Sequence, residues 1–258
     1  MIRSLLFTLW LYLSIVVFAV GCSPVLLLPR RAAMAVIRAW ARCVLFGLRW
    51  IAGVRVEYRG LEHRPAGAAL IAAKHQGMLD IIVPFVLLED PCFVLKKELM
   101  ILPFFGWFAW KADMIPIDRS AGSSALKGMV KRARARLAQG RQIVIFPEGT
   151  RTEPGEPSDY KPGVAALYRD LDRPCALVAT NSGVHWPAHG FRRHPGTAVF
   201  EFLDPLPAGL KRAEFMASLE GRIEARSGAL LGSRTQSDDL SLARRSTRGD
   251  LHATGSGR

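Results

Sequence analysis

Hydrophobic and polar positions divide the chain into three stretches. Residues 4–29, "SLLFTLWLYLSIVVFAVGCSPVLLLP", carry no charge. Residues 30–53 interleave arginines with apolar residues, which is typical of a basic amphipathic helix. From residue 54 onward, short strand-like runs alternate with segments of helical length. This alternation predicts one α/β domain over residues 54–228.

Seven strands and four helices are expected in this domain. The strands are predicted at 54–60, 68–74, 92–97, 114–118, 142–146, 175–180 and 198–203, and the helices at 78–88, 98–110, 124–139 and 162–171. Because strands alternate with helices, we predict a mixed, largely parallel sheet flanked by helices. Residues 229–258 lack periodicity and aromatic side chains, and we interpret them as a disordered tail.

The uncharged stretch 4–29 predicts a membrane-associated N-terminal helical segment, because it is long enough to cross a hydrocarbon core of about 30 Å. One arginine precedes it, whereas Arg30, Arg31, Arg38, Arg42 and Arg49 follow it. The positive-inside rule then places the α/β domain on the cytoplasmic side of the cell inner membrane.

Two other interpretations of the stretch stay open. It could be a cleaved signal peptide, since "AVGC" at 19–22 faintly resembles a lipoprotein cleavage site. It could also form a hairpin that enters one leaflet, because Gly21 and Pro24 interrupt it. Residues 30–53 would lie on the membrane surface or, alternatively, form a core helix of the domain.

Charge narrows the choice of partner. The net charge of +13 favours an anionic partner, such as a nucleic acid, an anionic membrane or a phosphorylated substrate. The four cysteines are scattered and form no CxxC pair, so neither a zinc site nor a disulfide framework is indicated.

The stretch "KHQGMLD" suggests a catalytic base. His75 ends a predicted strand, Gly77 permits a turn, and Asp80 falls in the first turns of the following helix. A carboxylate there can orient the imidazole, which gives two members of a catalytic triad without the nucleophile. The substrate would then supply the nucleophile, most simply a hydroxyl group. Taken alone, the spacing favours an ordinary histidine at the end of a strand over a catalytic one.

Two further stretches suggest a phosphate site. "FPEGTR" places Glu148, Gly149 and Arg151 at the end of another strand, where an arginine fork matches phosphate oxygens. Lys97 and Arg119 end two more predicted strands and could add positive charge. The alternative is a surface ion pair between Glu148 and Arg151, with Arg119 as a solvated loop charge.

The motifs HQGMLD, KELMILPFFG…IPIDR, FPEGTR and LVATNSG occur in this order. They closely resemble the four sequence blocks of the glycerolipid acyltransferases, and the resemblance covers residues 54–206. It implies transfer of a fatty acyl group from acyl-CoA or acyl carrier protein to a lysophospholipid. The expected acceptor is the sn-2 hydroxyl of 1-acyl-glycerol-3-phosphate, with a lyso-ornithine lipid as the alternative.

The resemblance also implies residue roles. His75 matches the general base and Asp80 its partner. Glu148, Gly149 and Arg151 match the block that binds the phosphoglycerol of the acceptor. Lys97 and Arg119 match basic positions that are also assigned to the acceptor. Neither a metal nor a cofactor is implied, and membrane lipids, not nucleic acid, are the expected partners.

Three positions depart from the family pattern. Lys74 stands where the family usually has asparagine, Gly77 where serine is frequent, and Leu177 where a proline is usual. The fourth block therefore receives no catalytic role. His185, His189 and His194 could suit a metal by spacing alone, but a basic loop near the membrane is the preferred interpretation.

Two other classes of protein explain part of this sequence. A lipid- or nucleic-acid-binding module would explain the charge but not a paired histidine and aspartate. A serine hydrolase would need a G-x-S-x-G elbow, which the chain does not contain.

Overall fold

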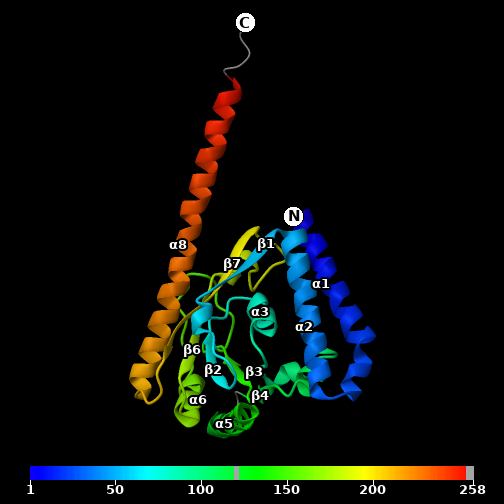
Figure 1. Ribbon diagram of the computed structural model, residues 1–258, viewed down its shortest axis with the longest axis vertical. Helices are drawn as coiled ribbons and strands as arrows, with labels where there is room; N and C mark the ends of the chain where they lie inside the picture. The colour runs from blue at the N-terminus through cyan, green and yellow to red at the C-terminus, as the bar shows by residue number, and fades with distance from the viewer. Residues whose placement is uncertain (119–121, 254–258) are drawn as a thin grey trace.

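One mixed sheet forms the centre of the molecule (Figure 1). The computed structural model describes residues 1–118 and 122–253, with 233–253 as helical backbone only. The strand order is β1-β7-β6-β2-β5-β3-β4, and every neighbouring pair is parallel except β6 with β7. The strands are β1 (Val54–Arg59), β2 (Ala69–Ala73), β3 (Pro91–Lys96), β4 (Ile115–Ile117), β5 (Gln142–Ile145), β6 (Cys175–Thr180) and β7 (Gly196–Leu206). All seven predicted strands and the largely parallel sheet are confirmed.

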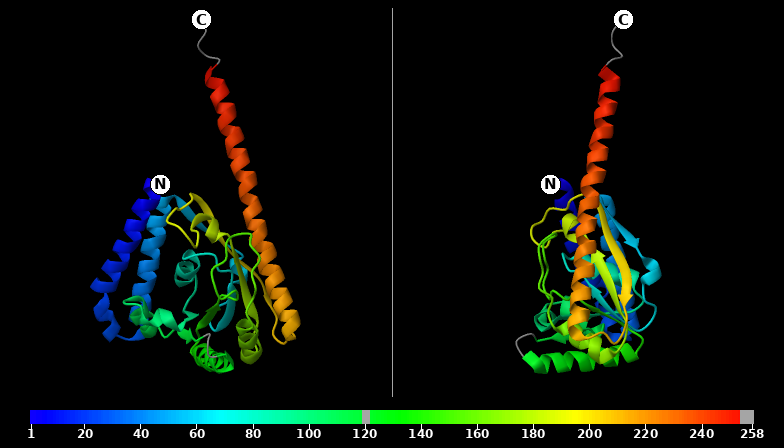
Figure 2. Two further views of the ribbon diagram at one scale, coloured as in Figure 1. Left: turned by 180° about the vertical axis from the view of Figure 1, so that it is seen from behind. Right: turned by 90° about the vertical axis from the view of Figure 1, so that its left-hand side faces the viewer.

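Helices cover both faces of the sheet, with α6 and α8 on one side and α2 and α3 on the other (Figures 1 and 2). The α-helices are α1 (Ile2–Gly21), α2 (Arg30–Gly47), α3 (Leu79–Leu87), α4 (Phe105–Lys111), α5 (Gly122–Ala138), α6 (Gly163–Leu171), α7 (Ser182–His185) and α8 (Arg212–Ala253). Shorter helical turns are η1 (Ser23–Leu27), η2 (Leu48–Ala52), η3 (Leu61–His63) and η4 (Lys97–Ile101).

The prediction of one continuous helix over 98–110 is wrong. The structure has η4, a break at residues 102–104, and then α4. Pro103 lacks an N–H donor and disfavours helical geometry at the residue before it. Phe104 has a left-handed backbone with φ 63°. Across the break, a Cβ at Gly106 would lie 2.0 Å from the carbonyl oxygen of Met100, so this close approach requires glycine.

Helix α8 is an element that the sequence analysis missed. Its inner face buries apolar residues spaced by four or seven positions against β6, β7 and α6, namely Phe215, Leu219, Ile223 and Leu230. The helix continues to residue 253, so the structure has helix over 229–253 where a disordered tail was predicted. Once a packed helix exists, adding a residue costs far less than starting a new helix. Residues 254–258 lie outside the described part of the chain.

The N-terminal segment is a helical hairpin. Helices α1 and α2 lie antiparallel and side by side, joined by η1 (Figures 1 and 2). Phe7 and Leu11 are buried between them, and the indole N–H of Trp10 donates to the Cys43 carbonyl oxygen at 3.1 Å. Helix α1 is long and apolar enough to cross a membrane, and only 28% of its most apolar window is buried. An apolar face this open has no partner in the described protein.

Helix α2 is sandwiched between α1 and α3 rather than lying alone on a surface. At its start, both terminal guanidinium nitrogens of Arg30 donate hydrogen bonds to the Asp90 carboxylate, at 2.8 and 2.6 Å. Asp90 also accepts a hydrogen bond from the fully buried Arg141 at 3.3 Å. Where a helix was predicted over residues 30–53, the structure has α2 followed by η2, and the apolar face of α2 packs on the rest of the protein. Contact of its remaining arginines with a membrane stays a prediction.

Truncation of α8 packing should destabilise the fold. Phe215 is fully buried and stacks on Tyr168 with ring centroids 3.8 Å apart. We expect Phe215→Ala to lower the free energy of unfolding by about 3–5 kcal/mol. The measurement is thermal unfolding of the purified protein in detergent, with the exposed neighbour change Glu214→Ala as control. Equal melting temperatures for the two variants would contradict the observed packing of α8.

Candidate active site

The predicted site residues lie at one edge of the sheet. Strands β6, β2, β5, β3 and β4 are mutually parallel, so their carboxyl ends share this edge. His75 follows β2, Glu148 follows β5, Lys97 follows β3, and Ser182 follows β6. In open α/β sheets, ligands bind outside these strand ends.

His75 and Asp80 meet as the spacing predicts. The imidazole Nδ1 of His75 lies 3.2 Å from Oδ2 of Asp80, which occupies the first turn of α3. The His75 ring stacks on Phe146, with centroids 4.1 Å apart and planes tilted by 17°. Its side chain is 12% exposed, so the ring is largely buried but still reaches solvent. With Nδ1–H donated to Asp80, Nε2 is left as the acceptor.

The Asp80 carboxylate is held by four donors. Besides His75, the backbone N–H groups of Gln76 and Gly77 donate to Oδ2 at 2.6 and 2.8 Å. The hydroxyl of Ser182 donates to Oδ1. Together these donors satisfy a buried carboxylate and fix its orientation. Ser182 lies in the fourth block, to which the sequence analysis assigned no role, and only its separation of 102 residues from Asp80 hid the contact.

The FPEGTR loop holds the backbone of His75 from both sides. The His75 N–H donates to Oε1 of Glu148 at 3.1 Å. The N–H and hydroxyl of Thr152 donate to the His75 carbonyl oxygen at 2.9 and 3.2 Å. Gly149 permits the loop geometry with φ 70°. His75 and the FPEGTR loop are thus one hydrogen-bonded unit, with Thr152 as an unpredicted member.

Gly77 explains one departure from the family pattern. A Cβ at this position would lie 2.4 Å from the carbonyl oxygen of Trp186, which is too close for any larger residue without a backbone shift. Gln76 makes a second link to the same region, because its Oε1 accepts from the Gly183 N–H at 3.0 Å. The loop after α7 therefore packs directly on the turn that carries His75.

Glu148 is buried beside Lys74, a second position at which the chain departs from the family pattern. The side chain of Glu148 is 1% exposed and that of Lys74 is 2% exposed, with Oε1 and Nζ 3.3 Å apart. Burial raises the pKa of Glu148, and the charge of Lys74 opposes this shift. The alternative of a surface ion pair between Glu148 and Arg151 is wrong, since Glu148 faces inward to Lys74.

The remaining basic positions differ in their surroundings. Arg151 is exposed, and its guanidinium donates to the Ala188 carbonyl oxygen at 3.4 Å. No ion pair involves Arg151 in the described ranges 1–118 and 122–232. Lys97 is half-exposed and forms an ion pair with Asp118, whose hydrogen bond raises the pKa of Lys97. Arg119 lies outside the described residues.

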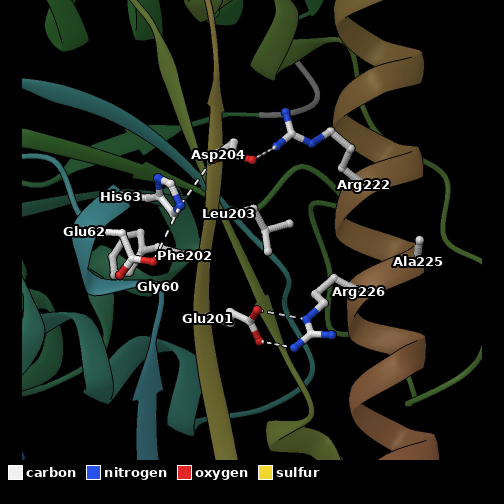
Figure 3. Close-up of a pocket in the computed structure, with 10 residues that line it drawn as sticks. All are labelled: Gly60, Glu62, His63, Glu201, Phe202, Leu203, Asp204, Arg222, Ala225 and Arg226. Carbon is white, nitrogen blue, oxygen red and sulfur yellow. Dashed lines mark hydrogen bonds and ion pairs between the residues drawn. The ribbon is translucent and has the colours of Figure 1, made fainter.

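A separate open groove of about 490 Å³ lies between β7, η3 and α8 (Figure 3). Its charged side chains pair with one another: Arg226 donates to Glu201 at 2.9 and 2.8 Å, and His63 lies 3.2 Å from Asp204. None of the candidate site residues lines it. The groove is thus distinct from the sheet edge that carries His75.

The histidine-rich loop gathers no metal site in the part of the chain that the structure describes, where no group of three or more potential ligands converges. His185 is buried, with Nδ1 2.9 Å from the His194 carbonyl oxygen. That the protein needs no metal stays a prediction.

Comparisons with known proteins agree with this geometry. A family model described as Acyltransferase matches residues 55–180. The 1-acyl-sn-glycerol-3-phosphate acyltransferase of Pseudomonas aeruginosa is 34% identical over 228 residues, covering 87% of this chain and 88% of the relative. The 1-acyl-sn-glycerol-3-phosphate acyltransferase alpha of Mus musculus is 30% identical over 169 residues, covering 64% of this chain and 59% of the relative.

A solved structure shares the fold. The crystal structure of the 1-acyl-sn-glycerophosphate (LPA) acyltransferase from Thermotoga maritima matches with a TM-score of 0.73 and 21% identity, over 89% of this chain and 96% of that one. Because the bacterial relative matches along most of both sequences, the chain belongs to the acyltransferase family that contains these proteins, and it is an O-acyltransferase.

Proposed function

We propose that the protein transfers a fatty acyl group from acyl-CoA or acyl carrier protein to the sn-2 hydroxyl of 1-acyl-glycerol-3-phosphate, giving phosphatidic acid. The observation that carries the proposal is the His75–Asp80 pair at the sheet edge, with Nδ1 and Oδ2 3.2 Å apart and Nε2 left as acceptor. The printed names of the relatives support the acceptor. They do not separate the two donors.

The reaction needs a base but no protein nucleophile. Nε2 of His75 removes the proton of the acceptor hydroxyl as its oxygen attacks the thioester carbonyl carbon. The C–O bond forms, the C–S bond breaks, and the imidazolium returns the proton to the leaving thiolate. Asp80 keeps the ring oriented and stabilises the imidazolium. General-base catalysis contributes roughly 10²–10⁴ in rate, and positioning of the substrates adds to it.

Arg151 is the phosphate-binding residue that the described structure supports best. It is an exposed residue of the FPEGTR loop that holds His75, and its guanidinium pairs with no carboxylate among the residues described. A planar fork suits a phosphomonoester. The positive charge of Lys97 is neutralised by Asp118. For Lys97 to bind the acceptor, this ion pair must either break or contact the acceptor with both side chains together. Arg119 keeps its proposed role on the resemblance alone.

The apolar face of α1 supports a membrane location. Leu9 is 64% exposed, and the exposed Leu27 of η1 lies at the hairpin tip. Near this tip, Leu26 and Trp107 help to line an apolar hollow of about 370 Å³. A lipid surface accommodates such side chains better than water. We place the protein at the cell inner membrane with its α/β domain in the cytoplasm, where both soluble donors occur, with no cofactor and no nucleic-acid partner.

Loss of the base should abolish turnover without unfolding the protein. We expect His75→Ala to lower kcat by about 10²–10⁴, because the acceptor hydroxyl loses its proton acceptor. Asp80→Asn should lose most of the activity through the wrong tautomer. The measurement is thiol release from acyl-CoA with lysophosphatidic acid as acceptor. His63→Ala, in the separate groove, is the matched control. A His75→Ala enzyme that kept more than about a tenth of the wild-type rate would exclude this base.

Removal of the Arg151 fork should discriminate between acceptors. We expect Arg151→Ala to lower kcat/KM for lysophosphatidic acid by about ten- to a hundredfold, which corresponds to a charge-assisted contact of roughly 1.5–3 kcal/mol. Arg151→Lys should restore only part of this loss. The apparent affinity for the thioester should barely change.

The control for this experiment is the exposed Arg59→Ala, together with a phosphate-free lysolipid as second acceptor. Equal losses for both acceptors would show that Arg151 is structural. Faster wild-type turnover of a lyso-ornithine lipid than of lysophosphatidic acid would favour the alternative acceptor.

Charges on the outer face of α1 should weaken membrane retention. Leu9→Glu with Leu13→Glu places two carboxylates on an exposed apolar face, at a cost of about 2–3 kcal/mol each inside a bilayer. We expect the double variant to appear in the soluble fraction after carbonate extraction. Leu61→Glu, an exposed leucine on η3, should stay in the membrane pellet as wild type does. Full retention of the double variant would contradict membrane contact through this face.

A further inference from the structure

Lys74 is a buried cation directly beside His75. Its ammonium lies 2.6 Å from Oε1 of Glu224, 3.1 Å from the hydroxyl oxygen of Ser158 and 3.3 Å from Oε1 of Glu148. An ammonium has three N–H donors, so these three oxygens satisfy it. The hydroxyl of Tyr160 donates to the same oxygen of Glu224 at 2.9 Å. Lys74, Glu148, Ser158, Tyr160 and Glu224 are called the buried lysine cluster below.

The cluster connects three parts of the chain that are distant in sequence. Lys74 follows β2, Glu148 belongs to the FPEGTR loop, and Glu224 comes from α8, 150 residues after Lys74. Helix α8 is held in place by the fully buried Phe215, Leu219 and Ile223, which precede Glu224 on the same helix. The C-terminal helix therefore contributes a charged group to the surroundings of the active site.

Glu148 depends on Lys74 for its charge. Oε1 of Glu148 accepts the backbone N–H of His75 at 3.1 Å, while Oε2 is buried without a hydrogen-bond partner in the described structure. Within residues 1–118 and 122–232, the one ion pair of Glu148 is with Lys74. Burial raises the pKa of Glu148, and Lys74 is the largest influence in the opposite direction.

The cluster holds one ammonium against two carboxylates. Besides Tyr160 of the cluster itself, other titratable groups face it from the neighbouring elements: His75 and Asp80 from the β2–α3 turn, and Glu220 from α8. Burial raises the pKa of Tyr160, so the phenol remains a neutral donor. If Lys74 lost its charge, Glu148 and Glu224 would share a largely buried site without a cation, and one of them would take up a proton.

We propose that Lys74 is a positioning residue, which keeps Glu148 as a carboxylate and thereby fixes the backbone of His75 and the FPEGTR loop for the acceptor. The inference rests on the proposed function, in which this loop binds the acceptor. A hydrogen bond to an ionised acceptor is stronger than one to a neutral group. Protonated Glu148 would hold the His75 N–H less firmly, because it would present an O–H donor where this N–H needs an acceptor.

Glu224 explains why a lysine suits this position. Asparagine, which the similar family usually carries there, could donate a hydrogen bond to Glu148 but brings no charge. In this chain α8 adds a second carboxylate, and a positive charge is needed to balance it. Lys74 and Glu224 thus act on Glu148 in opposite directions. The charge of Lys74 lowers the pKa of Glu148, whereas the carboxylate of Glu224 competes for the same ammonium and repels the carboxylate of Glu148.

The test compares pH profiles of kcat/KM for wild type, Lys74→Met, Glu224→Gln and the matched control Glu214→Gln, between about pH 5.5 and pH 9. Lys74→Met should move the acid limb to higher pH. Its activity should fall about tenfold for each pH unit below the shifted pKa and recover at alkaline pH. Glu224→Gln should move the acid limb to lower pH. Glu214, exposed in the first turn of α8, should leave the limb in place.

Thermal unfolding gives a second readout, because the melting temperature of Lys74→Met should change with pH in the direction opposite to its activity. A carboxyl group whose folded pKa lies above its unfolded value stabilises the fold at low pH, and this stability is lost as pH rises through the folded pKa. The melting temperature of Lys74→Met should therefore fall relative to wild type as pH rises, while its activity recovers. A merely structural defect would change activity and stability in the same direction.

A Lys74→Met profile that runs parallel to wild type, with a uniform loss, would overturn the proposal. A shift of Glu224→Gln to higher pH would do the same. If Lys74→Met does not fold, the downward shift of Glu224→Gln carries the test, because that variant removes a charge rather than exposing one. If wild type prefers another lysolipid, the profiles are recorded with that acceptor. Without any acyl transfer by wild type, the proposed function fails, and the pH dependence of the melting temperature still tests the cluster.

Discussion

The parallel pairing of β2 with β5 on one side and β6 on the other is the constraint on which the active site depends. All five residues of β2 are buried, so neither its register nor its direction can change without exposing the core. The carboxyl ends of the three strands must then lie side by side. As a consequence His75, the FPEGTR loop and the start of α7 meet within hydrogen-bonding distance.

Two buried carboxylates, Asp80 and Glu148, hold different parts of His75 at this edge of the sheet. Asp80 orients the His75 ring and receives donors from its own turn and from Ser182. Glu148 holds the His75 backbone and faces Lys74. The imidazole and its main chain are therefore positioned by different elements. With Nδ1 held by Asp80, Nε2 is left as the acceptor that a base needs.

The N-terminal hairpin and the active site share one loop. Phe7 of α1 packs edge-to-face on Trp186, with centroids 5.1 Å apart, and the guanidinium of Arg193 lies 4.6 Å from the Trp186 ring centroid. The carbonyl oxygen of Trp186 faces Gly77, and that of Ala188 accepts from Arg151. Residues 186–193 thus join the apolar hairpin to the turn that carries His75. For an enzyme of lipids, this arrangement links the element suited to a membrane with the residues that would meet a lipid acceptor.

Local pattern determined much of this protein. The alternation of strand-like runs and helices predicted all seven strands, and the five-residue spacing of His75 and Asp80 predicted their contact, because a strand–turn–helix is a local structure. The same reasoning failed where local and distant effects compete. Pro103 divided a stretch that is apolar throughout. Helix α8 was missed although Phe215, Leu219 and Ile223 recur every four residues, which is the spacing of one helix face.

Tertiary structure alone decided the rest. Ser182 reaches Asp80 across 102 residues, and Lys74 reaches Glu224 across 150. Neither pair has a spacing that a sequence pattern could reveal, since sheet order and helix docking bring the partners together. The sequence by itself thus determined which residue types stand at the strand ends. Only the fold decided which buried charges balance one another there, because the free energy of a buried charge depends on its neighbours in space and not on those along the chain.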